Sequence, residues 1–262
     1  MHVGSLSRHF LAAGAIWLGL TNGFASRCFG QTGHGGNEML EITSYKIKPD
    51  MSMEWEALVK TAVPALKKAG VPMVSFWHTA GFGEDEWFAA VPIEKFAQFD
   101  SPSPFVRALG EAGAIRLHAM AVKCFAEQPR SKAVRFREEL SIMQPMTEPP
   151  GIAVLTTVHV AFGRGPEFEA ILKGDVVPAM KKAGITGFWV YDTVLGGDVN
   201  EWDILTLYKN FADLDGPSPL VKALGQMGAD SLAAKSAGIV RSMERAVLRY
   251  RADLSYHEGS PQ

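Results

Sequence analysis

Hydrophobic and polar positions follow the same succession of periods twice along this chain. In the first pass, residues 41–48 alternate and favour a strand. A helical period follows, with one apolar face made of Trp55, Leu58, Val59, Ala62, Val63 and Leu66. Two strands are predicted next, at residues 73–79 and 86–91, joined by a glycine-containing turn. A second helix then extends to about Phe125, and an alternating segment with Val134 and Phe136 predicts a last strand. The order is therefore β-α-β-β-α-β.

The second pass repeats this order from residue 152 onwards. Residues 152–162, 187–193 and 201–207 predict strands, Phe168, Ile171, Leu172 and Val176 repeat the apolar helix face, and the second helix extends to about Ser242. Each first helix carries a proline, Pro64 or Pro178, which we expect to kink or interrupt it. Ser103 and Ser218, each followed by proline, predict helix N-caps.

Sequence identity between the passes shows that they are an internal repeat. Residues 63–70 (VPALKKAG) recur as residues 177–184 (VPAMKKAG), and residues 96–110 recur as residues 211–225 with ten identical positions. Because such blocks recur in the same order, we infer two tandem units, residues 39–142 and 151–256. The proline-rich residues 143–150 form the predicted linker, and residues 257–262 a tail.

The β-α-β-β-α-β order predicts a ferredoxin-like unit, an α+β fold with a four-stranded antiparallel sheet covered by helices on one face. The other face of a lone unit is bare and must be covered. A tandem repeat supplies the second unit in the same chain, so we expect the two sheets to pack bare face to bare face. The predicted protein is a monomer that contains an internal pseudo-dimer.

The first thirty residues have the character of a signal peptide. The apolar run of eleven residues from Phe10 to Leu20 follows Arg8, and small residues come after it. A bilayer span needs about 20 apolar residues, so this run does not predict a membrane helix. We therefore expect residues 1–30 to be cleaved, residues 31–38 to be a linker, and the mature protein to be periplasmic or extracellular. An apolar helix packed on the domain is the alternative.

Composition adds few constraints. The chain has 262 residues with a formal net charge of −2 and 47% hydrophobic residues, so it has enough apolar residues for a core and no basic excess for binding nucleic acid. The two cysteines are Cys28 and Cys124. If the exported protein retains Cys28, a disulfide bridge between Cys28 and Cys124 is one alternative. The apolar helical pattern around Cys124 instead favours a buried, inert thiol.

Several segments together resemble a known superfamily. The strand that ends in Tyr45-Lys46-Ile47-Lys48-Pro49, the helix with an internal proline and the strand with Phe76-Trp77 are similar to the dimeric α/β barrels, and within them to NIPSNAP-like domains. Residues 91–94 (VPIE) depart from the aromatic-acidic pair that usually ends this strand in the family. The resemblance implies the barrel fold. It leaves the reaction open, since the superfamily includes monooxygenases, isomerases and haem enzymes.

Candidate functional residues are those that differ between the copies. His78 aligns with Val190, and His159 aligns with Lys46. Either histidine is a candidate base, and His159 and Lys46 would form a polar patch if their strand face lined the barrel interior. The alternative for both histidines is a hydrogen-bonded structural role. By the resemblance, His118 is a conceivable axial ligand of haem, although no haem motif surrounds it. Otherwise no cofactor is predicted.

Tyr191 and Asp192 place a phenol beside a carboxylate, so Tyr191 is a candidate proton donor and Asp192 a candidate ligand contact, or alternatively a turn residue. Trp77 and Trp189 are candidate pocket walls, and their symmetric occurrence also fits core packing. Four arginines that both copies share alternate on one strand face and would form an anion site if they pointed inward, or ion pairs if they pointed outward: Arg135, Arg137, Arg249 and Arg251. Of these, Arg135 and Arg249 are the candidate ligand contacts.

The sequence contains no phosphate loop, no G-x-G-x-x-G, no H-E-x-x-H and no metal-ligand spacing, which argues against a nucleotide enzyme or a zinc hydrolase. The leading hypothesis is an exported barrel that binds a small apolar or aromatic molecule in a pocket lined by strand side chains. By the resemblance, cofactor-free oxygenation or isomerisation is open to it. The alternative is a non-catalytic structural or interaction protein with a filled barrel; a haem protein is the third hypothesis.

Overall fold

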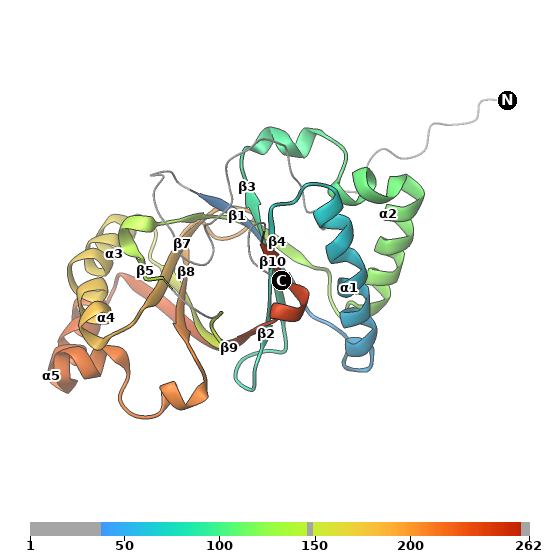
Figure 1. Cartoon of the computed structure of the whole chain (residues 1–262). Helices are drawn as coiled ribbons and strands as arrows, with labels where there is room; N and C mark the ends of the chain where they lie inside the picture. Colours follow the sequence, from blue (N-terminus) through green and yellow to red (C-terminus); the bar gives the residue numbers. More distant parts are fainter. Residues whose placement is uncertain (1–37, 146–148, 258–262) are drawn as a thin grey trace.

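The computed structural model describes residues 38–145 and 149–257, and in them the two repeats form one barrel (Figure 1). The predicted leader with Cys28, most of residues 31–38, residues 146–148 and the end of the tail lie outside the described residues. The first repeat contains β1 (Met39–Tyr45), α1 (Ser52–Lys68), β2 (Met73–Thr79), β3 (Trp87–Ile93), α2 (Pro104–Cys124), β4 (Arg130–Phe136) and β5 (Ile142–Met143).

The second repeat has the same order with a divided first helix. Its elements are β6 (Ile152–Val160), α3 (Gly165–Ile171), a π-helical turn (Leu172–Val176), α4 (Val177–Ala183), β7 (Gly187–Leu195), β8 (Glu201–Tyr208), α5 (Pro219–Ser236), β9 (Val240–Tyr250) and β10 (Tyr256–His257). The second helix therefore ends at Ser236, and not near Ser242 as expected. Residues 240–242 instead pair with β6 as part of β9, after a turn at Gly238, whose φ is 75°.

The strands close into one antiparallel barrel. Within the repeats the orders are β2-β3-β1-β4 and β7-β8-β6-β9. Pairing of β4 with β7 joins the two sheets on one side, and pairing of β2 with β9 joins them on the other. The short strands exchange partners between repeats, since β5 pairs with β7 and β10 pairs with β2. The predicted α+β fold with two ferredoxin-like units packed into a barrel is confirmed.

Alternation along the strands separates two layers. Inward-facing side chains meet across the barrel in a cluster that includes Trp77, Leu207 and Leu248, with Trp189 and Tyr250 packed against it. Outward-facing side chains pack beneath the helices, which cover the two ends of the assembly (Figure 1). The barrel interior is therefore occupied by side chains in this region, and the helix–sheet layers are two separate cores.

Local chemistry explains the helix boundaries. The hydroxyls of Ser103 and Ser218 accept hydrogen bonds from the amides of Val106 and Val221, as the predicted N-caps require. Helix α1 continues through Pro64, so the expected interruption is absent there, because a proline deletes only one hydrogen bond of the helix. Pro178 instead lies in the first turn of α4, where its missing N–H costs least. Cys124 is buried, as predicted.

Candidate functional site

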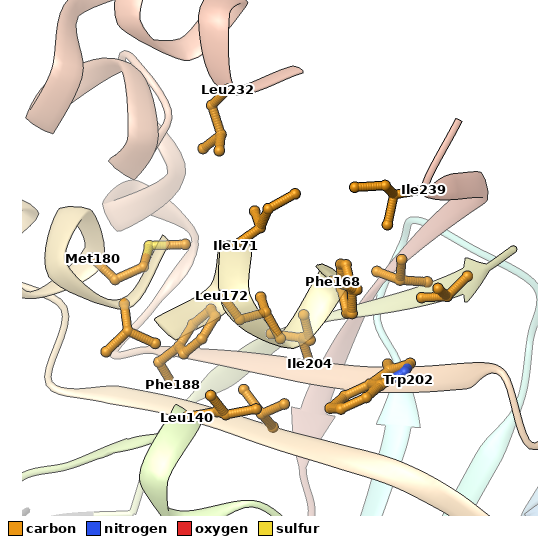
Figure 2. Close-up of a cluster of buried hydrophobic side chains, with 14 of the residues drawn as sticks. Leu140, Phe168, Ile171, Leu172, Met180, Phe188, Trp202, Ile204, Leu232 and Ile239 are labelled. Carbon is orange, nitrogen blue, oxygen red and sulfur yellow. The ribbon is translucent and has the colours of Figure 1, made fainter. Parts of the chain in front are cut away.

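A cavity of about 640 Å³ lies between the helices and the sheet of the second repeat. Its floor is the outward face of β6, β7, β8 and β9, and its roof comes from α3, the π turn, α4, α5 and the segment before α5. Figure 2 shows Leu232 on α5 pointing from the helix layer toward the strands that carry Phe188 and Ile204. Most of the lining is apolar and includes Val154, Val158, Phe168, Ile171, Leu172, Val176, Met180, Phe188, Ile204, Leu220 and Leu232.

One inserted residue shapes the roof of this cavity. Three residues separate Val59 from Val63 in the first repeat, and four separate their counterparts Leu172 and Val177 in the second. The extra residue is accommodated as the π-helical turn Leu172–Val176, where the first repeat has an uninterrupted α-helix. Leu172 and Val176, the two ends of this turn, both line the cavity. A π turn is the way a helix absorbs a single insertion, and such turns are frequent at functional sites.

The sheet contributes a small set of polar groups to the floor. These are the hydroxyls of Thr156 on β6 and of Thr206 and Tyr208 on β8, and the guanidinium of Arg245 on β9. Thr156 lies directly opposite Arg245 across the β6–β9 pair, and Val154 lies opposite Thr206 across the β6–β8 pair. The polar groups therefore occupy neighbouring positions on three adjacent strands, whose spacing is about 4.8 Å.

Other polar groups at the cavity wall already have partners. The hydroxyl of Ser218 caps α5, and the hydroxyl of Ser236 donates to the carbonyl of Leu232 at 2.9 Å. The carboxylate of Asp213 accepts the amide of Lys209 at 2.9 Å. These groups hold the ends of α5 and the turn before it, so the groups left to meet a ligand are those of the sheet.

Electrostatics distinguishes Tyr208 among them. Burial raises the pKa of its phenol, the charge of Asp213 adds to the rise, and the guanidinium of Arg245 opposes it. The phenol is therefore protonated at neutral pH and can donate a hydrogen bond into the cavity.

None of the nine sequence-predicted ligand or catalytic residues lines this cavity. His78 lies on β2, where its ring stacks on Trp87 at 4.1 Å between centroids and its Nε2 is 2.7 Å from the carboxylate of Asp85. Lys46 pairs with Glu84 at 2.6 Å and with Glu127 at 3.5 Å. Both side chains are thus engaged with the β2–β3 turn and the end of α2 in the first repeat.

His159 and Lys46 do not form the expected polar patch. The two nitrogens of His159 lie 3.7 Å from Asp198 and 3.8 Å from Glu201, around the β7–β8 turn. The two residues hold equivalent places in different copies, and each one meets acids of the turn in its own copy. Glu201 also pairs with Lys132. Burial lowers the pKa of Lys132, but the charges and hydrogen bonds of Asp203 and Glu201 outweigh burial, so the pKa is raised.

The aromatic candidates belong to the barrel interior. Trp77 packs on Tyr250 with ring centroids 5.0 Å apart, Trp189 joins the same cluster, and Tyr191 lies 5.3 Å from the ring of Phe136. These contacts are those of a packed core.

The shared arginines form ion pairs for the most part. Arg135 donates through Nε to Asp192 at 3.0 Å and also pairs with it through Nη2. Arg137 binds Glu139 and Glu169, and Arg251 binds Glu56 and Asp253. Arg249 is exposed, opposite His78 and Ile152 on the strands beside it. The four guanidinium groups therefore do not gather into an anion site.

Haem does not fit at His118. This residue stands on the exposed side of α2, whereas an axial ligand must lie in a site that encloses the porphyrin. Within the described residues, no three His, Cys, Asp or Glu side chains gather to hold a metal ion, and no helix has the length and apolar character needed to cross a membrane.

Sequence reasoning missed the cavity because it sought chemistry at histidines and tryptophans inside the barrel. Two signals pointed to the cavity. One was the insertion between Leu172 and Val177, and the other was the replacement of Ser131 in the first repeat by Arg245 in the second. Each is a difference between the copies that lies on the helix-facing side of the sheet.

No protein-family model matches the chain, and comparison with the curated proteins finds no relative. Several solved structures share its fold. A candidate monooxygenase from Fusobacterium nucleatum is 14% identical, with a TM-score of 0.57 over 86% of this chain and 96% of its own. An anthrone oxidase-like protein is 9% identical, with a TM-score of 0.58 over 86% and 95%.

A chlorite dismutase variant from Candidatus Nitrospira defluvii is 10% identical, with a TM-score of 0.50 over 84% of this chain and 93% of its own. At these identities the comparisons establish the fold and leave the activity open. The more specific resemblance to NIPSNAP-like domains stays a prediction. The fold of this chain is that of the dimeric α/β barrels, with both ferredoxin-like units supplied by one polypeptide.

Proposed function

We propose that this protein binds a small, largely apolar molecule in the cavity of its second repeat. The observation that carries the proposal is the cavity itself, about 640 Å³ in volume, apolar over most of its surface and provided with a few polar groups on one wall. This is the size and composition typical of sites for small molecules, which span roughly 300–1,000 Å³. In the first repeat, the positions equivalent to Phe168 and Val158 of the cavity lining hold the larger aromatic residues Trp55 and Tyr45.

The cavity also separates this proposal from the structural alternative. A filled barrel was the expectation for a scaffold protein, and the barrel interior does contain a packed cluster around Trp77 and Leu248. The binding site that we propose lies outside the barrel, beneath the helices, so a filled interior does not argue against it.

A catalytic role would use the same cavity. Among the structures that share the fold are a candidate monooxygenase and an anthrone oxidase-like protein, and cofactor-free oxygenation or isomerisation remains our proposal for such a role. The phenol of Tyr208 faces the cavity, whereas His78 and His159 do not line it. A catalytic proton transfer would therefore depend on Tyr208, and consumption of O₂ with a bound ligand separates oxygenation from isomerisation.

Binding can be tested with N-phenyl-1-naphthylamine, a neutral aromatic probe whose fluorescence rises in apolar sites. We expect saturable binding at one site per chain. Ala229→Trp should weaken binding at least tenfold, because Ala229 lines the cavity and an indole there occupies ligand space. Ala234→Trp is the matched control, since Ala234 is exposed on the same helix outside the lining. Equal affinity of both variants, or no binding by the unmodified protein, would refute the proposal.

We also propose export, on the basis of the apolar run at residues 10–20. Expression of the full chain in a bacterium with two membranes, followed by fractionation and N-terminal sequencing, tests it. A periplasmic protein that begins between residues 24 and 31 is expected. An uncleaved chain in the cytoplasmic fraction would overturn this part of the proposal.

A further inference from the structure

We infer that the ligand of the cavity carries a carboxylate, which Arg245 and the hydroxyl groups beside it recognise. The inference rests on the proposed function and specifies the chemical class of its ligand: an apolar or aromatic body with one anionic end. It is argued from the polar groups on the cavity floor, from their charge and from their absence in the first repeat.

The first step concerns Thr206. Thr206 is 6% exposed and lines the cavity. A hydroxyl at the wall of a cavity can donate a hydrogen bond to a ligand or accept one from it. An oxygen atom of a ligand lying on the floor would accept the hydrogen bond that Thr206 donates.

The second step concerns the charge of Arg245. Its guanidinium contacts the sulfur of Met243 at 3.6 Å, and among the described residues it pairs with no carboxylate. Two other arginines on or beside the same strand do pair, since Arg241 binds Asp198 at 2.8 Å and Arg251 binds Glu56 at 2.8 Å. Arg249, the third, is exposed and lies outside the cavity lining. Arg245 is an exposed residue, and it therefore presents a guanidinium without a carboxylate partner at the rim of an apolar cavity, where it can attract an anionic group of a ligand.

The one acid in the cavity lining, Asp213, forms no ion pair with Arg245 among the described residues. Asp213 lines the cavity and acts on Tyr208, and its carboxylate holds the amide of Lys209. The phenol of Tyr208 is protonated because burial raises its pKa, so it donates rather than repels. The floor thus offers the guanidinium of Arg245 and the phenol of Tyr208 as donors, with the hydroxyls of Thr156 and Thr206 on the same floor. This set of donors suits the two oxygens of a carboxylate.

The third step is the comparison between repeats. The equivalents of Arg245 and Val154 in the first repeat are Ser131 and Glu41, so the positive charge belongs to the second repeat alone. Ser131 there bonds to Thr43 at 2.8 Å and serves the packing of the first repeat. The guanidinium at the cavity is therefore a difference between the copies, and it has no counterpart at the same position of the first repeat.

The test measures displacement of N-phenyl-1-naphthylamine by 2-naphthoate and by 2-naphthamide, two molecules of similar shape that differ in charge. In the unmodified protein we expect 2-naphthoate to bind at least tenfold more tightly than the amide. Arg245→Gln should bring the ratio of the two affinities close to one, and Thr206→Val should lower it by a smaller factor. Added salt should weaken binding of 2-naphthoate and leave the amide unchanged.

Lys222→Gln is the control, because Lys222 is exposed on α5 outside the cavity lining. Its replacement removes one positive charge, as Arg245→Gln does. The preference for 2-naphthoate should persist in it. If the probe binds but both competitors displace it equally, or if Arg245→Gln keeps the preference, the inference fails while the binding proposal stands. If the probe does not bind the unmodified protein, it is the proposed function that fails.

Discussion

The two repeats solve the same packing problem beneath their helices in different ways. In the first repeat, Trp55 stands at the centre of an aromatic cluster, with ring centroids 4.9 Å from Tyr45, 5.7 Å from Phe125 and 6.5 Å from Trp87. In the second repeat, Phe168 and Val158 hold the places of Trp55 and Tyr45. These side chains are smaller, and both line the cavity. One fold thus has an aromatic cluster beneath the helices of one copy and the described cavity beneath those of the other.

The first helices of the two repeats also differ in their continuity. Helix α1 is continuous over Ser52–Lys68, while its counterpart is divided into α3, the π turn and α4. Close packing normally fills the space between helices and a sheet, and the divided helix is the feature of the second repeat that accompanies a cavity there. The first repeat packs aromatic rings beneath a continuous helix, whereas the second places beneath a divided helix the cavity that we propose binds a ligand.

The largest expected effect concerns the filled core. Trp55→Ala should lower the free energy of unfolding by about 3–5 kcal/mol, because it removes the ring at the centre of the aromatic cluster. The buried indole N–H of Trp55 has no hydrogen-bond partner in the described residues, so the expected loss comes from the apolar contacts of the ring. Phe168→Ala should cost less than Trp55→Ala, because Phe168 already borders the cavity and has fewer contacts to lose. Urea unfolding of both variants measures the difference, and a larger loss for Phe168→Ala would reverse the comparison.

A second prediction concerns Glu41, whose counterpart is Val154. Glu41 is 8% exposed on the helix-facing side of β1, and burial raises its pKa to about 7 despite a hydrogen bond from Ser131. Below about pH 4.5 the carboxyl is protonated in both folded and unfolded chains. As pH rises toward 7, the unfolded chain loses the proton while the folded chain keeps it, so stability falls by about 3 kcal/mol at most.

Glu41→Gln should therefore gain up to about 3 kcal/mol relative to the unmodified protein at pH 8, and almost nothing at pH 4.5. Denaturant unfolding at the two pH values measures both differences. Glu56→Gln is a control of opposite sign, since pairing with Arg251 lowers the pKa of Glu56 and its stabilising effect grows as pH rises. A gain for Glu41→Gln that is equal at both pH values would show that its charge is not the cause.

The fold was predictable because it depends on patterns that occur twice. The strand Met73–Thr79 has the predicted bounds, and the N-caps at Ser103 and Ser218 are formed as the sequence indicated. The predicted end of α5 was wrong by about six residues, because the stop at Gly238 was not recognised and residues 240–242 pair with β6 as part of β9. Pairing between distant strands is tertiary information that a local period does not contain.

The site was harder to predict for a related reason. Strand alternation groups His159 with Leu155 and Thr157 on one face, but it does not say which face meets the helices and which meets the other sheet. That assignment depends on barrel closure through the β2–β9 and β4–β7 pairs. A cavity also arises from what is missing between side chains, and no single residue marks it. Only the differences between the copies, such as Arg245 in place of Ser131, carried a signal.

The smallest expected effect concerns the π turn, because one inserted residue distinguishes the first helix of the second repeat from α1. Deleting Gly174 gives the second repeat the helix length of the first, and the first repeat shows that the fold accepts that length. The turn should become α-helical and rotate Phe168, Ile171 and Leu172 relative to α4. We expect binding of N-phenyl-1-naphthylamine to weaken about tenfold, which corresponds to about 1.4 kcal/mol.

The matched control is Gly174→Ala, which keeps the inserted residue. No atom lies within 4 Å of a Cβ built at this position, so alanine fits and the helix gains propensity without a change of length. This variant should bind the probe as the unmodified protein does, and the deletion should unfold at a similar temperature. A folded deletion variant with unchanged affinity would show that smaller side chains alone keep the cavity open. Loss of binding in the deletion but not in the alanine variant would assign that role to the inserted residue, because length is the only property that separates the two variants.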